Sequence, residues 1–139
     1  MLKHKKVQLY TDGGARGNPG PAGIGAIIKD GDKIIAQGSR YIGETTNNQA
    51  EYQALFFGLT KVKEMGVKEV DCFLDSELVV NQLNHKFKIK DPDLGKWFIK
   101  IHNLSLSFKK IRFNHIYRGD NRLADRLVNE AIDRGLADR

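Results

Sequence analysis

The chain has 139 residues, a length that supports one hydrophobic core, and we expect residues 1–139 to form a single domain. Its apolar fraction of 40% and charged fraction of 29% are ordinary for a globular protein, and no apolar run approaches the ~20 residues needed to span a membrane. Lysine and arginine number 23 against 17 acidic residues, and the formal net charge of +6 is compatible with a polyanionic partner without requiring one.

The first part of the chain predicts a three-stranded antiparallel meander. Polar and apolar residues alternate through 7–11, which predicts the first strand. The stretch 13–21 is rich in glycine and proline and is predicted to be a loop. Residues 22–29 and 33–42 are predicted to be the next two strands, and the Asp-Gly-Asp turn at 30–32 joins them as a hairpin.

Helical spacing replaces this alternation from residue 50. A first helix is predicted to end at Gly66, and its apolar face consists of Ala50, Ala54, Leu55, Leu59 and Val62. The apolar run 70–74 predicts a short central strand, and a second helix is expected to start near Ser76. The lone Cys72 cannot form an internal disulfide and is predicted to be a core residue, which, with the absence of a signal-peptide core, predicts a cytoplasmic location.

The last third of the chain predicts two helices and one strand. A basic linker at 85–91 precedes Pro92, which is well suited to open a third helix. A fifth strand is predicted at 111–117 and a final helix from about 121 to 134, ended by Gly135. The inward residues of that helix are predicted to be Leu123, Leu127, Val128, Ala131 and Ile132. The order β-β-β-α-β-α-α-β-α predicts an α/β fold with a mixed five-stranded sheet and helices on its faces.

Asp12 and Glu51 are the first two of four acidic residues that lie where a predicted strand ends or a helix begins. Asp12 precedes two glycines, as a turn residue often does, but the loop predicted after it is too long for a hairpin turn. Glu51 is expected in the first turn of its helix, where Asn48 as N-cap would make it part of a capping box. Thr46 with Gln49 offers a competing box, which would leave Glu51 free to face the sheet.

Asp75 and Asp125 complete the set. Asp75 follows the central strand, and either Asp75 or Ser76 can cap the next helix. If Ser76 is the cap, Asp75 stands at the carboxyl end of a central strand, where α/β sheets gather their ligand sites. Asp125 lies in the first turn of the last helix, where it serves either the helix dipole or a ligand.

Four carboxylates in one cleft of a basic protein would repel one another unless divalent cations neutralise them. Ions of the Mg²⁺ type take oxygen ligands, and two such ions ~4 Å apart can activate a water on one side of a phosphodiester and stabilise the leaving oxygen on the other. The four acids therefore predict metal-dependent phosphate chemistry.

Four motifs in this order resemble those of the ribonuclease HI family, and the resemblance covers essentially the whole chain. They are Tyr10-Thr11-Asp12-Gly13-Gly14 with Gly17-Asn18-Pro19-Gly20-Pro21, Thr46-Asn47-Asn48-Gln49-Ala50-Glu51, Asp75-Ser76, and Asn121-x-x-Ala124-Asp125. The resemblance implies the ribonuclease H-like fold and an endonuclease that hydrolyses the RNA strand of RNA–DNA hybrids, leaving 3′-hydroxyl and 5′-phosphate ends. It also implies two Mg²⁺ ions, with Mn²⁺ as a substitute.

The resemblance also implies a role for particular residues. Its catalytic metal ligands would be Asp12, Glu51, Asp75 and Asp125. Its contacts with the two nucleic-acid strands would come from Gly13, Gly14, Asn18, Thr46, Asn47 and Asn48. This agrees with their chemistry, because amides and hydroxyls hydrogen-bond both phosphates and the 2′-hydroxyl of RNA, and glycines let the backbone approach closely.

The chain departs from many members of that family in two places. It lacks a long basic protrusion, of which only the basic segment 85–90 remains, and it lacks a flexible histidine loop before the last acid. His115 is predicted to lie inside the fifth strand as a structural residue. Arg118 is the better placed candidate, and its permanent charge suits phosphate contact or product release rather than proton transfer. This short form resembles archaeal and some bacterial members, for which double-stranded RNA is a further substrate to consider.

The alternative to an enzyme is a catalytically silent module that binds hybrids through the same fold. The complete set of four acids argues against it, because clustered negative charge weakens the binding of a polyanion. We therefore expect an enzyme with RNA–DNA hybrid as its partner, no membrane association and a monomeric state.

Overall fold

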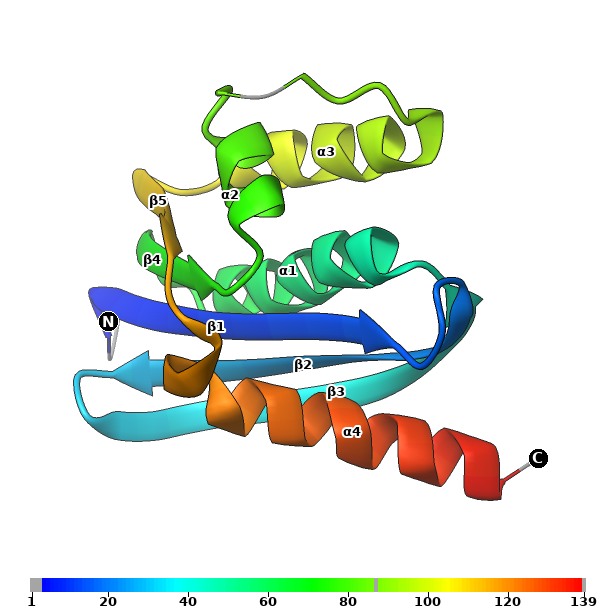
Figure 1. The fold of residues 1–139 in the computed structure, drawn as a ribbon. Coiled ribbons are helices and arrows are strands. Elements are labelled where there is room, and N and C mark those ends of the chain that lie inside the picture. The colour runs from blue at the N-terminus through cyan, green and yellow to red at the C-terminus, as the bar shows by residue number, and fades with distance from the viewer. Residues whose placement is uncertain (1–3, 87, 139) are drawn as a thin grey trace.

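Five strands form one mixed sheet in the computed structural model, which describes residues 4–86 and 88–138 (Figure 1). In the order β3-β2-β1-β4-β5, they are β3 (Lys33–Thr45), β2 (Gly20–Asp30), β1 (Lys6–Ala15), β4 (Glu69–Leu74) and β5 (Lys110–His115). The first three strands are antiparallel, and β4 and β5 run parallel to β1. This confirms the predicted meander and the mixed five-stranded sheet.

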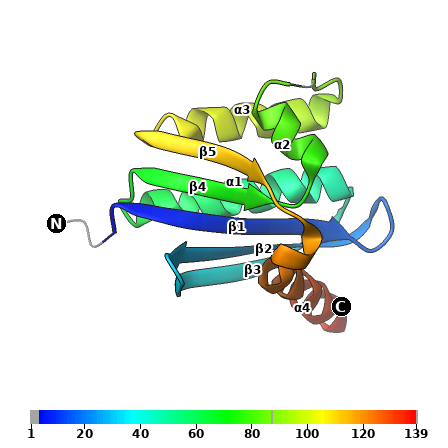
Figure 2. The same cartoon turned by 60° about the vertical axis from the view of Figure 1, so that its left-hand side comes forward.

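The helices cover the two faces of the sheet unequally (Figures 1 and 2). On one face lies α1 (Asn47–Glu64), which packs against β1 and β2 and is flanked by α2 (Glu77–Leu83) and α3 (Pro92–Ser105). On the other face, α4 (Arg122–Ala137) packs mainly on β2 and β3 and only on part of β1. A short 3₁₀ turn, η1 (Arg118–Asp120), leads from β5 into α4. The predicted order of elements is thereby confirmed.

The main core lies between the sheet and α1. Alternate residues of β1 and β4 point into it, among them Val7, Leu9 and Cys72, each fully buried. The predicted apolar face of the first helix lies in the same core, and Gly66 follows the helix in the left-handed conformation (φ 78°) that a C-terminal stop requires. Burial of Cys72 confirms its prediction as a core residue.

Strand boundaries differ from the sequence prediction in several places: β3 continues to Thr45 instead of ending at 42, and β5 ends at His115 instead of 117. The stretch 13–21 is not a loop throughout, because β1 continues to Ala15 and β2 begins at Gly20, with Gly13 opposite Ile24. Asp12 therefore lies inside a strand rather than at its end. Glycine at 13 marks a close approach of helix and strand, described below, and not a turn.

Helix boundaries also differ in places. Glu51 is in the second turn of α1 rather than the first, because Thr46 is the N-cap and its Oγ1 accepts a hydrogen bond from the backbone N of Gln49 (3.2 Å). At the other end of the chain, α4 continues past Gly135 to Ala137, and Leu123 is 40% exposed instead of inward. Gly135 has a packing reason instead, because a Cβ there would lie 2.1 Å from the Tyr41 ring.

Part of the basic linker predicted at 85–91 lies outside the described residues, namely Phe87. Within the described part of the chain, no helix combines the length and hydrophobicity of a membrane span.

Candidate active site

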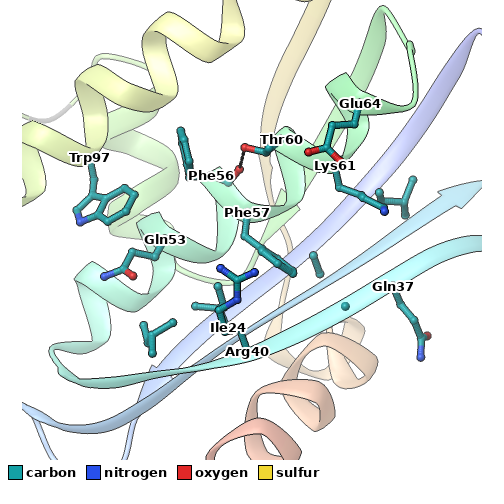
Figure 3. Close-up of a pocket in the computed structure, with 14 residues that line it drawn as sticks. Ile24, Gln37, Arg40, Gln53, Phe56, Phe57, Thr60, Lys61, Glu64 and Trp97 are labelled. Carbon is teal, nitrogen blue, oxygen red and sulfur yellow. Dashed lines mark hydrogen bonds between the residues drawn. The ribbon is translucent and has the colours of Figure 1, made fainter.

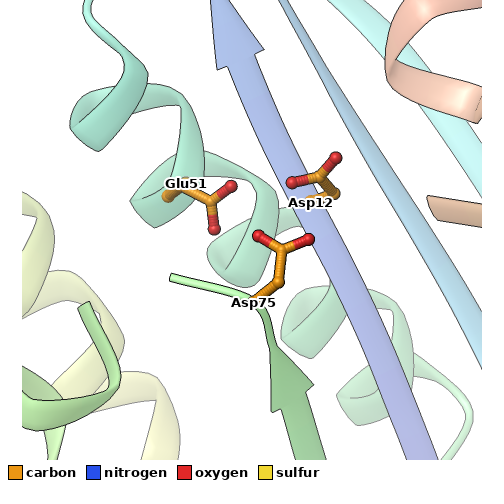
Figure 4. A group of neighbouring side chains, drawn as sticks. All are labelled: Asp12, Glu51 and Asp75. Atoms are coloured by element: carbon orange, nitrogen blue, oxygen red, sulfur yellow. The ribbon is translucent and has the colours of Figure 1, made fainter. Parts of the chain in front are cut away.

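Three of the four predicted acids meet where β1, α1 and the end of β4 come together (Figure 4). Asp12 is on β1, Glu51 on α1, and Asp75 directly follows β4. One carboxylate oxygen from each lies within 4.8 Å of the other two. Residues far apart in sequence converge because β1 and β4 are adjacent parallel strands and α1 packs across them. Ser76 caps α2, its Oγ accepting from Val79 N, which leaves Asp75 free to face the other acids.

Gly13 sets the distance between α1 and the strand that carries Asp12. Its backbone N donates a hydrogen bond to Glu51 Oε1 (3.0 Å) and so orients that carboxylate. A Cβ on Gly13 would lie 2.1 Å from the carbonyl oxygen of Ala50, a separation that real atoms do not tolerate. Glycine is therefore required here for helix packing, whatever it contributes to substrate contact.

We expect Gly13→Ala to destabilise the fold by about 3 kcal/mol, because α1 must move away from β1 to admit the methyl group. Urea unfolding followed by circular dichroism measures this change. Gly14→Ala is the matched control, since its Cβ would meet only side-chain atoms at 3.8 Å or more. Equal stabilities of the two variants would contradict a packing requirement at position 13.

The cluster is electrostatically costly without a cation. Asp12 and Glu51 are only 7% and 6% exposed, and burial together with the neighbouring carboxylates raises the pKa of Asp12 to about 7. Burial likewise holds the pKa of Glu51 well above its ordinary value. Glu51 Oε2 is buried and has no hydrogen-bond partner among the described residues. An all-oxygen set of buried, crowded carboxylates with one oxygen unsatisfied fits a hard divalent cation.

Asp125 lines the same cavity but stands outside the three-carboxylate group. Its position in the first turn of α4 matches the sequence prediction. Its charge contributes to the raised pKa of Asp12, after the larger effect of burial. One of its oxygens lies 3.8 Å from a guanidinium nitrogen of Arg118, whose side chain is 84% exposed at the mouth of the cavity. Its role as a fourth metal ligand stays a prediction.

Asn121 is a buried positioning residue to which the sequence alone assigned no role. Its Nδ2 donates to the carbonyl oxygen of Thr11 (2.9 Å) and to Asp75 Oδ2 (3.2 Å), so it ties β1 to the residue after β4. At 2% exposure it is inaccessible to substrate. An asparagine before a helix is ordinarily interpreted as a cap, yet its side chain makes no cap bond here.

The remaining predicted contact residues gather at the start of α1 beside the cluster. Asn47 N donates to Asn18 Oδ1 (3.0 Å), and Asn47 Oδ1 accepts from Ala15 N (2.7 Å), which joins the loop after β1 to the helix start. Asn47, Asn48, Gly13 and Gly14 line a cavity of about 450 Å³ together with the four acids. The sequence did not single out Arg16, which lines this cavity and bonds Asp133 at 2.7 Å.

A second cavity, of about 490 Å³, contains none of the four acids (Figure 3). It lies between β2, β3 and α1, and its walls are mainly apolar, with Ile24, Phe56, Phe57 and Trp97 among the residues that line it. Polar side chains, among them Arg40 and Lys61, also line this cavity, but the described residues form no carboxylate cluster there that could hold a cation. The acid-lined cavity is therefore the candidate active site.

A mixed sheet in the order 3-2-1-4-5 with carboxylates on its central strands defines the ribonuclease H-like class of α/β proteins. Comparisons with known proteins agree. Residues 10–131 match the family model described as reverse transcriptase-like. The chain is 42% identical over 130 residues to a bifunctional protein of Mycobacterium tuberculosis, which covers 92% of this chain and 36% of that protein.

Solved structures are also similar over nearly their full length. The RNase H1 of Halobacterium salinarum has a TM-score of 0.90 and 40% identity, covering 92% of this chain and 98% of that one. LC11-RNase H1 from compost, solved in complex with an RNA/DNA hybrid, has a TM-score of 0.90 and 46% identity. The match covers 94% of this chain and 99% of that one. The chain belongs to the type 1 ribonuclease H family of enzymes. It spans about a third of the mycobacterial relative and 65% of the curated Halobacterium ribonuclease HI.

Proposed function

We propose that this protein is a single-domain, monomeric, cytoplasmic endonuclease that hydrolyses the RNA strand of RNA–DNA hybrids and leaves 3′-hydroxyl and 5′-phosphate ends. The observation that carries the proposal is the cluster of Asp12, Glu51 and Asp75, the first two buried, that lines a polar cavity in a protein of net charge +6. A structure 46% identical to this chain was solved with an RNA/DNA hybrid, which supports the choice of substrate.

The three clustered carboxylates would hold divalent cations, with Asp125 as a fourth ligand. Two Mg²⁺ ions, or Mn²⁺ in their place, would supply activation of water and stabilisation of the leaving oxygen. The chain's own residues do the rest. Gly13 N orients Glu51, and Asn121 orients Asp75. Amides and backbone groups around Asn47 would hold the strands, since they can bond phosphates and the RNA 2′-hydroxyl.

Two alternatives follow from the same site. The first is cleavage of double-stranded RNA, which we consider because the chain lacks the long basic protrusion and the histidine loop of many family members. The second is a silent hybrid-binding module, which the crowded cluster disfavours because clustered carboxylates, where deprotonated and without cations, repel a polyanion. An enzyme gains from such a cluster through its cations, and a binder does not.

Cleavage of a strand-labelled RNA–DNA hybrid in Mg²⁺, in Mn²⁺ and in EDTA tests the proposal, with a matching RNA duplex in parallel. We expect cuts in the RNA strand only, with 5′-phosphate ends, and none in EDTA. The duplex reaction shows how broad the substrate range is. Folded protein that cuts neither substrate in either metal would leave only the binding-module alternative.

Arg118→Ala is expected to lower the turnover number by about tenfold without abolishing cleavage. The exposed guanidinium stands at the mouth of the cavity beside Asp125, where it can contact a phosphate, and it is too basic to carry a proton. Steady-state kinetics at saturating hybrid measure the effect, and Arg118→Lys should retain part of the rate. A rate equal to that of the unmodified protein would remove Arg118 from the reaction.

A further inference from the structure

One face of the sheet is open over its β4–β5 half. Figure 2 shows β1, β4 and β5 toward the viewer with α1 and α3 behind them, and the connection from β5 to α4 passing over β1 only near its end. Among the described elements, α4 packs mainly on β2 and β3. Strand alternation sends Val7, Leu9, Val70 and Cys72 into the core on the α1 side, so their sequence neighbours face this open side.

Two aromatic rings stand at the centre of the open face. Tyr10 of β1 and Phe73 of β4 are direct partners in the parallel register, and their rings stack with centroids 4.9 Å apart at 17°. Both residues are only half-buried. Cross-strand aromatic pairs stabilise sheets in general, so the pair alone does not indicate a ligand.

Groups that suit nucleic acid continue the row on both sides of this pair. Lys29 Nζ of β2 lies 5.2 Å from the centre of the Tyr10 ring. On β5, Asn114 is the register partner of Phe73, and the exposed Arg112 is one step away on the same face. The row therefore presents a cation, two stacked rings, an amide and a second cation across four adjacent strands.

The charge balance of the face favours a polyanion. The acids of β4 on this face, Asp71 and Glu69, are each paired, with Lys6 at 2.9 Å and Lys110 at 3.9 Å respectively. Asp120 lines the small cavity beside Tyr10 and Lys29, where Arg122 also lies. The cations of Lys29 and Arg112 come in addition to these pairs. A positive surface with half-exposed aromatic rings is the combination by which open sheets bind single-stranded nucleic acid, with bases on the rings and phosphates on the cations.

The open face is continuous with the carboxylate cluster. Asp12 follows Tyr10 by two residues on β1, and Asp75 follows Phe73 by two residues at the end of β4. Two residues along a strand span about 7 Å, so a strand bound at the cluster can extend onto the rings without leaving the surface. A cavity of about 170 Å³, lined by Tyr10, Lys29, Asn121 and Arg122 among others, adjoins the same place.

We propose that the open face of β1, β4 and β5 binds an unpaired stretch of nucleic acid through base stacking on Tyr10 and Phe73 and phosphate contacts with Lys29 and Arg112. This site is separate from the cavity where the hybrid would be cut. It would engage a single-stranded extension of a substrate or a free strand. Stacking and charge both tolerate any base, so binding is expected to depend little on sequence.

Fluorescence anisotropy with a labelled single-stranded RNA oligonucleotide in EDTA tests this, because no metal-dependent cleavage occurs under these conditions. Phe73→Leu removes the ring but keeps an apolar side chain in the strand, and it is expected to weaken binding about tenfold. Lys29→Gln with Arg112→Gln should weaken binding and flatten its dependence on salt. Lys63→Gln is the matched control, since Lys63 is exposed in the last turn of α1 on the other side of the sheet.

Weakening in the face variants but not in Lys63→Gln, at unchanged melting temperature, would support the proposal. Equal binding by all variants, or equal weakening in all of them, would overturn it and leave the face for a protein partner. Cleavage of a short blunt hybrid is measured alongside. Phe73→Leu should cut it at the unmodified rate, so a failure of this proposal is distinguishable from a failure of the catalytic one.

Discussion

Asp75→Asn is expected to lower hybrid cleavage by about a thousandfold while hybrid binding stays unchanged or becomes tighter. Asp75 contributes one of the three clustered carboxylate oxygens, and removing its charge weakens cation binding. The bound cations would stabilise the charge of the transition state by several kcal/mol. Binding does not suffer, because one less negative charge faces the phosphates of the substrate. Single-turnover cleavage in Mg²⁺ and anisotropy in EDTA measure the two quantities separately.

The asparagine substitution is chosen because it preserves shape. Its amide oxygen can still accept the hydrogen bond that Asn121 Nδ2 gives to Asp75 Oδ2, so β1 and the end of β4 should stay connected. Glu69→Gln is the matched control, as it removes one carboxylate from β4 away from the cluster. Loss of fold and binding together would assign Asp75 a structural role, and full cleavage would remove the cluster from the reaction.

The sequence predicts the parts of this protein that local patterns determine. Strand alternation, helical spacing and the change between them were sufficient for the order of elements and for the mixed sheet. The sequence also predicted that three acids would meet, because their convergence depends only on which elements are neighbours. They are Asp12, Glu51 and Asp75. The Thr46 cap, one of two alternatives in the sequence, is the one that frees Glu51 for the site.

The remaining features depend on contacts between distant segments. Gly13 and Gly135 are local turn signals, yet each is required by an atom of another element, the Ala50 carbonyl and the Tyr41 ring. Asn121 bonds the carbonyl of Thr11, 110 residues away, and no local pattern encodes that contact. Arg16 reaches Asp133 in the same way. Where a residue is required by a contact with a distant segment, the role that its local sequence pattern predicts is wrong.

The carboxylate cluster should also make stability depend on pH and on cations. Burial raises the pKa of Asp12 from 3.8 to about 7, so between these values the folded protein without cations binds more protons than the unfolded chain. Stability must then fall as pH rises through this window and level off above it. The full effect of this rise is about 4 kcal/mol, or about 14 °C in melting temperature for a chain of this size.

Asp12→Asn is expected to be more stable than the unmodified protein in EDTA at pH 8 and to approach it in stability near pH 4. The difference between the two melting curves reports the cluster, because groups far from it titrate alike in both proteins, while the pKa of Glu51, which the charge of Asp12 helps to raise, falls in the variant. Asp32→Asn is the control, since it removes the same charge from an exposed turn and should shift neither curve. Differential scanning calorimetry across this pH range measures the difference.

Mg²⁺ should reverse the order of the two proteins. Cations bind the deprotonated acids, so they stabilise the unmodified protein more at pH 8 than at pH 5, while Asp12→Asn, with one ligand fewer, gains little at either pH. A bound cation then offsets both the burial and the mutual repulsion of the acids. A melting temperature that is independent of Mg²⁺ in the unmodified protein would contradict a cation site at this cluster, whatever the outcome in EDTA.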